Sequence, residues 1–210
     1  SASRYEILRS IVVPGAFIDQ QQIQSMPILG DDPIRAAQVL PGVAANSASA
    51  RSYIRGSDTR NTGIVLNGNE LLEPYHVRNF QSLFSAIDSR AVDLVIDKKF
   101  GEPRYNDFLG QISAKLGDAT TISFNALVAS DKIRLVTERK PTEPEESSSN
   151  ARSAQFWINW EQDWNPSLSS MTTVSINDYD NDRVEFANDP EEIIAEITDK
   201  RSLRILRLNQ

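Results

Sequence analysis

Few residues in this sequence have types and spacings that support chemistry. His76 is the only histidine and no cysteine is present, which excludes a thiolate nucleophile, a disulfide framework and a zinc site built from cysteines. A histidine that acts as a general base or a metal ligand usually needs partners, and no cluster of histidines and carboxylates surrounds His76 in the sequence. Nucleophile-elbow, phosphate-loop and paired-carboxylate motifs are also absent. We therefore expect that the protein is not an enzyme and needs no cofactor.

The acidic run Asp178–Asp182 superficially resembles a calcium-binding loop. An EF-hand requires glycine at the sixth position and a bidentate glutamate at the twelfth. Here those positions hold Arg183 and Asp189. We interpret the run as a solvated acidic loop, with loose calcium binding outside the cell as the alternative, and we predict no metal site.

Composition limits the kinds of partner. The chain has 210 residues, of which 40% are hydrophobic and 24% charged, enough for one ordinary domain or two small ones. The net charge of −7 argues against a nucleic-acid partner, because phosphate binding needs a clustered basic surface. No apolar run is long enough for a transmembrane helix, and Ser1–Glu6 has no signal-peptide core. An exported protein would therefore have this sequence as a mature or trimmed chain.

The first 90 residues have the pattern of a compact mixed α/β unit. Asp31 and Asp32 precede Pro33, which suits the start of a helix. Asn67–Gly68 is a strong hairpin-turn dipeptide, and simple hairpin geometry is the favoured interpretation of it. The expected elements are strands at Ile11–Val13, Ser52–Ile54 and Gly63–Leu66, and helices at Phe17–Met26, Ile34–Leu40 and Phe80–Ile87.

After residue 100 the pattern changes to alternation of apolar and polar residues, which predicts strands. One face of each strand is apolar and can meet lipid or a protein core. The other face is rich in Gln, Ser, Asn, Thr and Glu and can meet water or a plugged lumen, although Trp157 interrupts it. About five strands are expected, at Phe108–Leu116, Ile122–Val128, Ala154–Glu161, Thr172–Asn177 and Ser202–Asn209.

The connections between these strands alternate in length. Gly117–Asp118 and Asn165–Pro166 predict short turns, whereas the polar stretches Thr137–Arg152 and Asp178–Arg201 predict long loops. Short turns at one end and long loops at the other are typical of outer-membrane β-barrels. Alternation by itself fits a soluble β-sandwich equally well.

Aromatic residues cluster in one expected strand and the turn that follows it. Phe156, Trp157, Trp160 and Trp164 suit either an interfacial aromatic belt or the core of a soluble sandwich. Trp164 stands beside the short turn, where a periplasmic belt would lie.

Four motifs follow one another between residues 11 and 88. They are Gly30–Val43, with a helix pattern followed by Leu-Pro-Gly-Val; Ile54–Gly56, with an Arg-Gly motif; Ile64–Leu71, a strand and turn with Asn-Gly; and Pro74–His76 followed by the expected helix Phe80–Ile87. Together and in this order, they resemble the plug domain of a TonB-dependent outer-membrane receptor, in which Asp-Gly is usual at the Asn-Gly turn.

The resemblance implies a fold class and two domains. We expect an α+β plug domain at residues 1–93, followed at 94–210 by about five antiparallel strands of a transmembrane β-barrel. This barrel is incomplete, because closed barrels that hold a plug need about 22 strands. The family usually has a Gly-Gly-Phe-Pro-Ala segment after the plug, and here Asp88–Asp97 leads straight to Phe100–Tyr105. We therefore expect a partial receptor that lacks a stretch near residues 89–95, the TonB box and most of the barrel.

The resemblance also implies a function and site residues. The function is an outer-membrane receptor for TonB-coupled uptake of a scarce ligand such as a siderophore–iron complex or cobalamin, with the plug gating the barrel. The implied partners are the TonB complex of the inner membrane, outer-membrane lipid and a small-molecule or metal-chelate ligand. Arg55 is expected to anchor the plug to the barrel wall, with Glu161 as a candidate partner. Tyr75 and His76 are candidate ligand contacts, with a packed surface histidine as the alternative for His76.

A second class of function fits the sequence without the resemblance. It is a soluble β-rich binding or assembly module of the periplasm or cell surface, with residues 1–90 as an independent α/β domain. Partitioning between the outer membrane and the aqueous fraction distinguishes the two.

Overall fold

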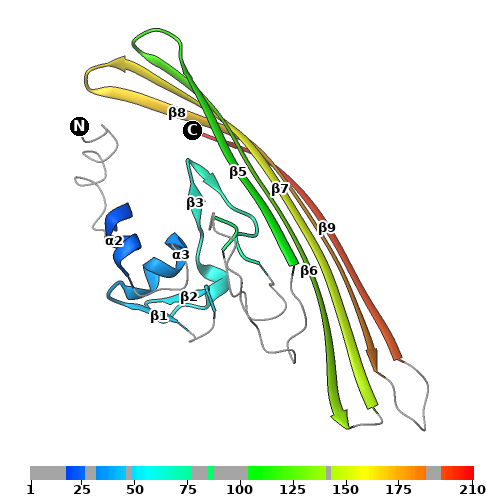
Figure 1. Cartoon of the computed structure of the whole chain (residues 1–210). Coiled ribbons are helices and arrows are strands. Elements are labelled where there is room, and N and C mark those ends of the chain that lie inside the picture. Colours follow the sequence, from blue (N-terminus) through cyan, green and yellow to red (C-terminus); the bar gives the residue numbers. More distant parts are fainter. Residues whose placement is uncertain are drawn as a thin grey trace.

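The computed structural model consists of a long, curved β-sheet with a group of short elements on one side of it (Figure 1). We call the described residues before residue 88 the N-terminal segment. The structure describes residues 18–26, 32–45, 49–76, 85–87, 104–140, 143–187 and 195–210.

The sheet contains five antiparallel strands in the order β5-β6-β7-β8-β9, so each strand pairs with its neighbours in sequence. Its described strands form an open sheet with β5 and β9 at the edges, and they close no barrel. The predicted number of strands and their antiparallel pairing are confirmed. The strands are β5 (Arg104–Lys115), β6 (Thr120–Lys140), β7 (Glu143–Asn165), β8 (Leu168–Ala187) and β9 (Ala195–Asn209).

Both predicted short turns are confirmed. Gly117 has φ +83° between β5 and β6, a left-handed conformation that glycine adopts without steric penalty. The Leu116 amide donates to the Thr120 carbonyl over 2.8 Å. Between β7 and β8, the Ser167 amide donates to Asn165 Oδ1 over 2.9 Å.

The prediction of two long loops was wrong for most of their residues. Within Thr137–Arg152, all residues except 141–142 belong to β6 or β7, and within Asp178–Arg201 all except 188–194 belong to β8 or β9. Strand pairing uses backbone groups, so it continues through these polar stretches. The apolar alternation used to bound the strands ends well before the pairing does.

The N-terminal segment is built from short helices and two small hairpin-like sheets. Strand β1 pairs with β2, and β3 pairs with β4, both antiparallel. Its elements are α2 (Gln20–Ser25), α3 (Pro33–Ala36), η1 (Ala37–Val39), β1 (Val43–Ala45), β2 (Ser52–Ile54), η2 (Thr59–Asn61), β3 (Val65–Leu66) and β4 (Asn69–Glu70).

Local sequence signals explain several of these elements. Asp32 caps α3, since its Oδ1 accepts from the Ile34 amide over 2.8 Å, and Pro33 begins the helix as predicted. Asn67 and Gly68 have φ 46° and 80°, which confirms the hairpin turn between β3 and β4. The predicted strand Ser52–Ile54 is β2.

Three expectations fall wholly or partly outside the described residues. The strand at Ile11–Val13 and the domain boundary after residue 93 lie outside them. Of the expected helix Phe80–Ile87, residues 80–84 lie outside, and Ser85 forms an isolated bridge with Tyr75 followed by a turn. No helix within the described ranges is long and apolar enough to cross a membrane.

The two faces of the sheet have opposite polarity. Side chains of even-numbered residues point away from the N-terminal segment, and their central row is apolar and exposed. Ile112 and Leu208, at the two edges of this row, are 75% and 72% exposed. The row comprises the register neighbours Ile112, Phe124, Ile158, Val174 and Leu208. We call this side the apolar face and the opposite side the polar face.

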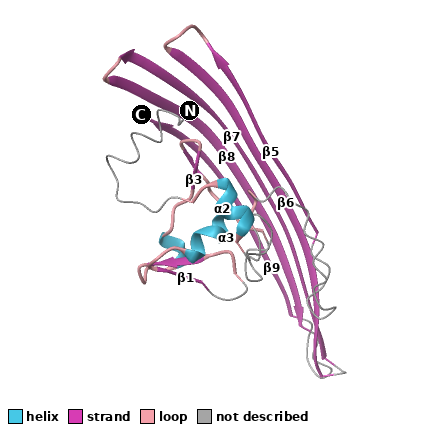
Figure 2. Ribbon diagram, turned by 60° about the vertical axis from the view of Figure 1, so that its left-hand side comes forward, coloured by secondary structure: helices cyan, strands magenta, loops and turns pink. Residues whose placement is uncertain are grey.

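The polar face is the one that the N-terminal segment covers. Figures 1 and 2 both place the short elements on this one side of the sheet. Among its apolar residues, Leu109 and Leu203 lie on the edge strands and stay half-exposed, whereas Leu127 and Trp157 on the central strands are buried. The fully or nearly buried polar side chains on the three central strands include Ser123, Asn125, Ser153, Gln155, Asn159, Thr173, Ser175 and Asn177.

Candidate functional site between the N-terminal segment and the sheet

The Asn67–Gly68 turn is a tip of the N-terminal segment that contacts the sheet. The Asn67 carbonyl accepts from Trp157 Nε1 over 3.2 Å and from Asn159 Nδ2 over 2.7 Å. The Asn67 side chain donates to Asn125 Oδ1 over 3.1 Å. A side chain at residue 68 would meet Met171 Cε at 2.8 Å. Glycine therefore serves both the turn geometry and the close approach to the sheet.

Two further amide contacts extend this interface. Asn69 Nδ2 donates to Asn177 Oδ1 over 3.4 Å, and the Leu72 amide donates to Gln155 Oε1 over 3.0 Å. Asn69, Gln155 and Asn177 are all fully buried. These contacts give the polar side chains of the sheet partners, as burial of polar groups requires.

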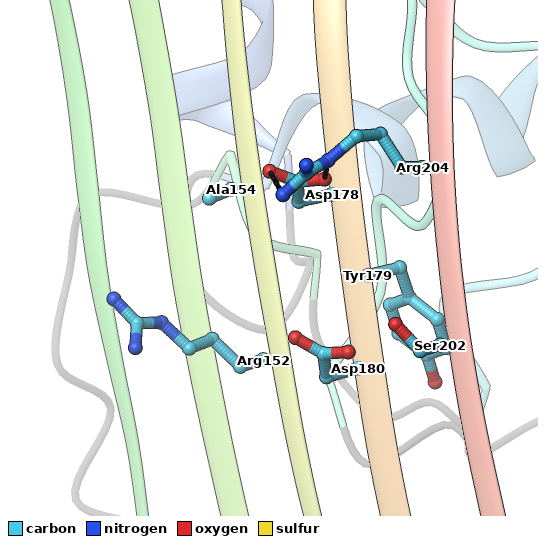
Figure 3. A pocket seen from close by; sticks show the side chains of 7 residues that line it. All are labelled: Arg152, Ala154, Asp178, Tyr179, Asp180, Ser202 and Arg204. Atoms are coloured by element: carbon cyan, nitrogen blue, oxygen red, sulfur yellow. Dashed lines mark hydrogen bonds and ion pairs between the residues drawn. The ribbon is translucent and has the colours of Figure 1, made fainter.

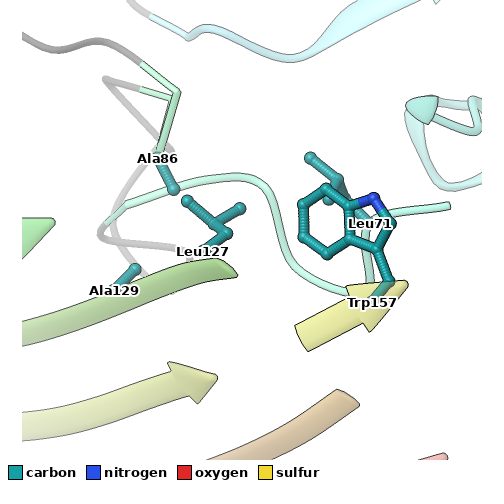
Figure 4. Packing of buried hydrophobic residues seen from close by; sticks show 5 residues of the cluster. All are labelled: Leu71, Ala86, Leu127, Ala129 and Trp157. Atoms are coloured by element: carbon teal, nitrogen blue, oxygen red, sulfur yellow. The ribbon is translucent and has the colours of Figure 1, made fainter. Parts of the chain in front are cut away.

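A small apolar cluster lies within the same interface (Figure 4). Leu71 and Ala86 from the N-terminal segment pack with Leu127, Ala129 and Trp157 from β6 and β7. Trp157 is 1% exposed, because it lies on the polar face beneath the segment. The apolar residue that interrupts the polar pattern of β7 is therefore an anchor for the segment.

Charged contacts join described residues of the segment and the sheet at Arg207 and at His76. Arg207 of β9 lies 3.0 Å from Glu70 Oε2 and donates to the Glu70 carbonyl over 3.1 Å. The second place is His76, whose side chain is 1% exposed. Its Nε2 lies 2.6 Å from Asp107 Oδ2 of β5, and its Nδ1 contacts Asp131 Oδ1 of β6.

The two aspartates determine the charge of His76. Burial of the imidazole lowers its pKa, but the hydrogen bonds to Asp107 and Asp131 and their negative charges outweigh this and raise the pKa of His76 to about 9. Only the imidazolium has a proton for both carboxylates. His76 is therefore a buried cation at neutral pH, clamped between two strands.

Tyr75 and His76, the predicted ligand contacts, both lie inside the interface. Tyr75 is half-buried, and the guanidinium of Arg51 lies 5.1 Å from the centre of its ring. Arg51 also lies 3.5 Å from Glu73. The His76 ring lies 4.7 Å from that of Tyr105. The ligand role of Tyr75 and His76 stays a prediction. His76 is packed, as the alternative interpretation holds, but it is buried and not at the surface.

The structure does not bring together the predicted anchoring pair. Arg55 is an exposed residue with φ 50° in the turn after β2, and Glu161 is half-buried on the polar face of β7. No hydrogen bond or ion pair joins the two among the contacts of the described residues. Their anchoring role stays a prediction, whereas Glu70–Arg207 and His76 with its two aspartates form charged contacts between segment and sheet.

The four aromatic residues of the predicted cluster lie on both faces of the sheet. Phe156, Trp160 and Trp164 lie on the apolar face, with Trp160 48% and Trp164 61% exposed. The inclusion of Trp157 in an exposed belt was wrong, because alternation in β7 turns its side chain to the polar face.

The acidic run Asp178–Asp182 is part of β8 and not a loop, which corrects that prediction. Asp178 pairs with Arg204 of β9, beside Arg152, Asp180 and Ser202 (Figure 3). These side chains line a pocket on the apolar face, at the end where its apolar side chains give way to charged ones. Within the described part of the chain, no group of three or more metal-ligating residues could hold an ion.

Sequence reasoning missed Asp107, Asp131 and Arg207 as contacts of the N-terminal segment. A signal for them was present, because all three are odd-numbered and therefore share the polar face with Gln155. Asp107 and Asp131 fell just outside the strand limits set by apolar alternation.

The fold therefore defines a class of structure, an open antiparallel sheet whose polar face carries a small α/β segment. No protein-family model, curated protein or solved structure matches the chain.

Proposed function

We propose that this chain is part of an outer-membrane receptor for TonB-coupled uptake, in which the N-terminal segment is the plug and the five strands form part of the surrounding wall. The observation that carries the proposal is the polarity of the sheet. Large apolar side chains occupy its uncovered face, and polar side chains lie buried beneath the segment. A water-dissolved sheet normally buries its apolar face, whereas membrane barrels turn that face to lipid and the polar face to the lumen.

The dimensions of the apolar face agree with this assignment. A strand needs roughly 9–11 residues to cross a bilayer, and Ala154–Trp164 of β7 spans such a length. Trp160 and Trp164 occupy the end nearest the β7–β8 turn, where an aromatic girdle is expected. The opposite end of the apolar face carries the charged residues Arg152, Asp178, Asp180 and Arg204.

The TonB partner and the ligand class rest on the sequence motifs of the N-terminal segment. Scarce, bulky ligands such as a siderophore–iron complex or cobalamin are the class that such receptors import. The proposed mechanism is that the plug closes the path until ligand binding and a pull on the N-terminal side displace it. The interface described above is what this pull must separate.

Tryptophan fluorescence provides a direct test, because the chain has three tryptophans on opposite faces. We expect the protein to fractionate with the outer membrane. After reconstitution with brominated lipids, a variant that retains only Trp160 should be strongly quenched, and one that retains only Trp157 should be protected. Recovery in the aqueous fraction without detergent, with neither tryptophan quenched by lipid, would overturn the proposal in favour of a soluble assembly module.

A further inference from the structure

We propose that His76 is an electrostatic lock, which holds the N-terminal segment on the sheet while its imidazole is doubly protonated and releases the segment when that charge is lost. The inference rests on the proposed function for its biological meaning, since the locked segment would be the closed plug. The residue would position the plug and need not contact the transported ligand.

The geometry supports a role in joining elements. His76 belongs to the N-terminal segment, whereas Asp107 and Asp131 belong to the adjacent strands β5 and β6. The ring thus holds three pieces of chain together through its two nitrogens. Tyr105 of β5 packs against the ring, with 4.7 Å between the ring centres.

The other contacts of the segment do not depend on a proton in the same way. The Asn67, Asn69 and Leu72 contacts join neutral amide groups. The Glu70–Arg207 pair is partly exposed, so solvent and salt weaken it. The His76 side chain is 1% exposed, and the side chains of Asp107 and Asp131 are 15% and 12% exposed. Removal of the imidazolium charge would leave two mostly buried carboxylates facing a ring with only one proton to donate.

Other titratable and charged groups lie around His76. On the segment, Glu73 and Arg51 pair beside Tyr75. On the sheet, Asp131 lines a small cavity together with Tyr179 from β8. The groups facing the site are therefore Arg51, Glu73 and Tyr75 from the segment and Tyr105, Asp107, Asp131 and Tyr179 from the sheet, whereas the even-numbered Arg152 points to the opposite face.

The pH dependence follows from the charge of the bound and released ring. The pKa of His76 is about 9 in the interface and 6.5 for an ordinary histidine. Because the bound pKa is the higher one, the stabilisation is fully present below pH 6.5 and is lost as the pH rises through about 9. The attachment equilibrium should weaken by on the order of a hundredfold across this window.

The absence of native cysteines allows two spin labels to report attachment in the full chain. We would label cysteines introduced at Asn61 in the segment and Asn106 on β5, both exposed. In detergent micelles, we expect mainly one narrow distance distribution at pH 7 and a second, longer population that grows as the pH rises from 7 to about 9. Circular dichroism would check that the sheet stays folded throughout.

Two variants and a matched control separate a lock from ordinary packing. His76→Gln should populate the long distance at pH 7 and show no further rise to pH 10. Asp107→Asn combined with Asp131→Asn keeps the ring but removes its charged partners, and should abolish the transition between pH 7 and 10. Asp58→Asn should leave the wild-type profile unchanged, because Asp58 is exposed and its ion pair among the described residues is with Arg60 in the same turn.

A flat wild-type profile from pH 6 to 10, or a profile unchanged in the Asp107 and Asp131 double variant, would overturn the lock. A long population in His76→Gln together with a flat wild-type profile would show packing alone and would also overturn it. These results say nothing about lipid contact. Failure of the tryptophan quenching test would overturn the receptor function and leave the pH-dependent distance intact.

Discussion

Asp32 and Asp19 both cap short helices, but they differ in what else they contact. Asp19 is exposed and forms a capping box with Gln22. Asp32 is fully buried, and besides capping α3 it accepts from the Ser85 amide over 3.0 Å and from Ser85 Oγ over 2.8 Å. It therefore joins α3 to a segment distant in sequence.

We predict that Asp32→Ala destabilises the N-terminal segment by about 2–4 kcal/mol, since it removes a cap and leaves buried donors without an acceptor. Asp19→Ala should cost about 1 kcal/mol or less. Hydrogen exchange of the Ser85 amide measures the difference. Equal protection of Ser85 in the two variants would contradict the linking role of Asp32.

At the residue scale, local contacts were predictable and distant ones were not. Pro33 after Asp32 indicated the start of a helix from neighbouring residues alone. The contact of Asp32 with Ser85, like that of His76 with Asp107 and Asp131, joins residues far apart in sequence. Such pairs depend on how the elements dock, which a local pattern does not specify.

The β3–β4 hairpin contains a glycine whose environment can be compared with that of a matched glycine. Gly68 and Gly56 both have left-handed φ values, +80° and +76°. An added Cβ at Gly68 would meet Met171 Cε at 2.8 Å and Thr173 Oγ1 at 3.1 Å, whereas at Gly56 nothing lies within 4 Å. The two positions share backbone strain and differ in contact with the sheet.

We predict that Gly68→Ala loosens the hairpin from the sheet more than Gly56→Ala does. Both substitutions carry about 1–2 kcal/mol of left-handed strain, and Gly68→Ala adds the displacement of Met171 and Thr173. Limited proteolysis of the N-terminal segment reports the loosening. If Gly56→Ala increases cleavage as much as Gly68→Ala, the hairpin is not held by the sheet as described.

At the element scale, the existence of the five strands was predictable and their length was not. The alternation from Ala154 to Trp160 identifies β7 because apolar side chains mark every second position. The first part of the strand, Glu143–Asn150, is polar apart from Pro144 and has no such marker. Its pairing with β6 and β8 comes from backbone hydrogen bonds, which the side-chain pattern does not reveal.

For the molecule as a whole, the sequence predicted that the sheet has an apolar and a polar face. It did not predict whether each face meets lipid, water or another part of the protein. Alternation assigns Ile158 and Asn159 to opposite sides, yet a soluble sandwich and a membrane barrel share that pattern. The placement of the N-terminal segment on the Asn159 side supports the proposed membrane barrel. It requires the docking of Asn67 and Leu72 on the sheet, a tertiary contact between distant parts of the chain.

A charge placed on the apolar face tests the surroundings of the whole sheet. We predict that Ile158→Arg lowers the free energy of unfolding from lipid vesicles by about 2–4 kcal/mol, because the middle of a bilayer solvates a cation poorly. Asn150→Arg is the matched control, since it lies on the same face of β7 beyond the apolar rows and should change stability by about 0.5 kcal/mol or less. Urea titration in vesicles measures both. In water, Ile158 would already be half-exposed and both substitutions would be tolerated, so equal small effects would contradict a lipid-facing sheet.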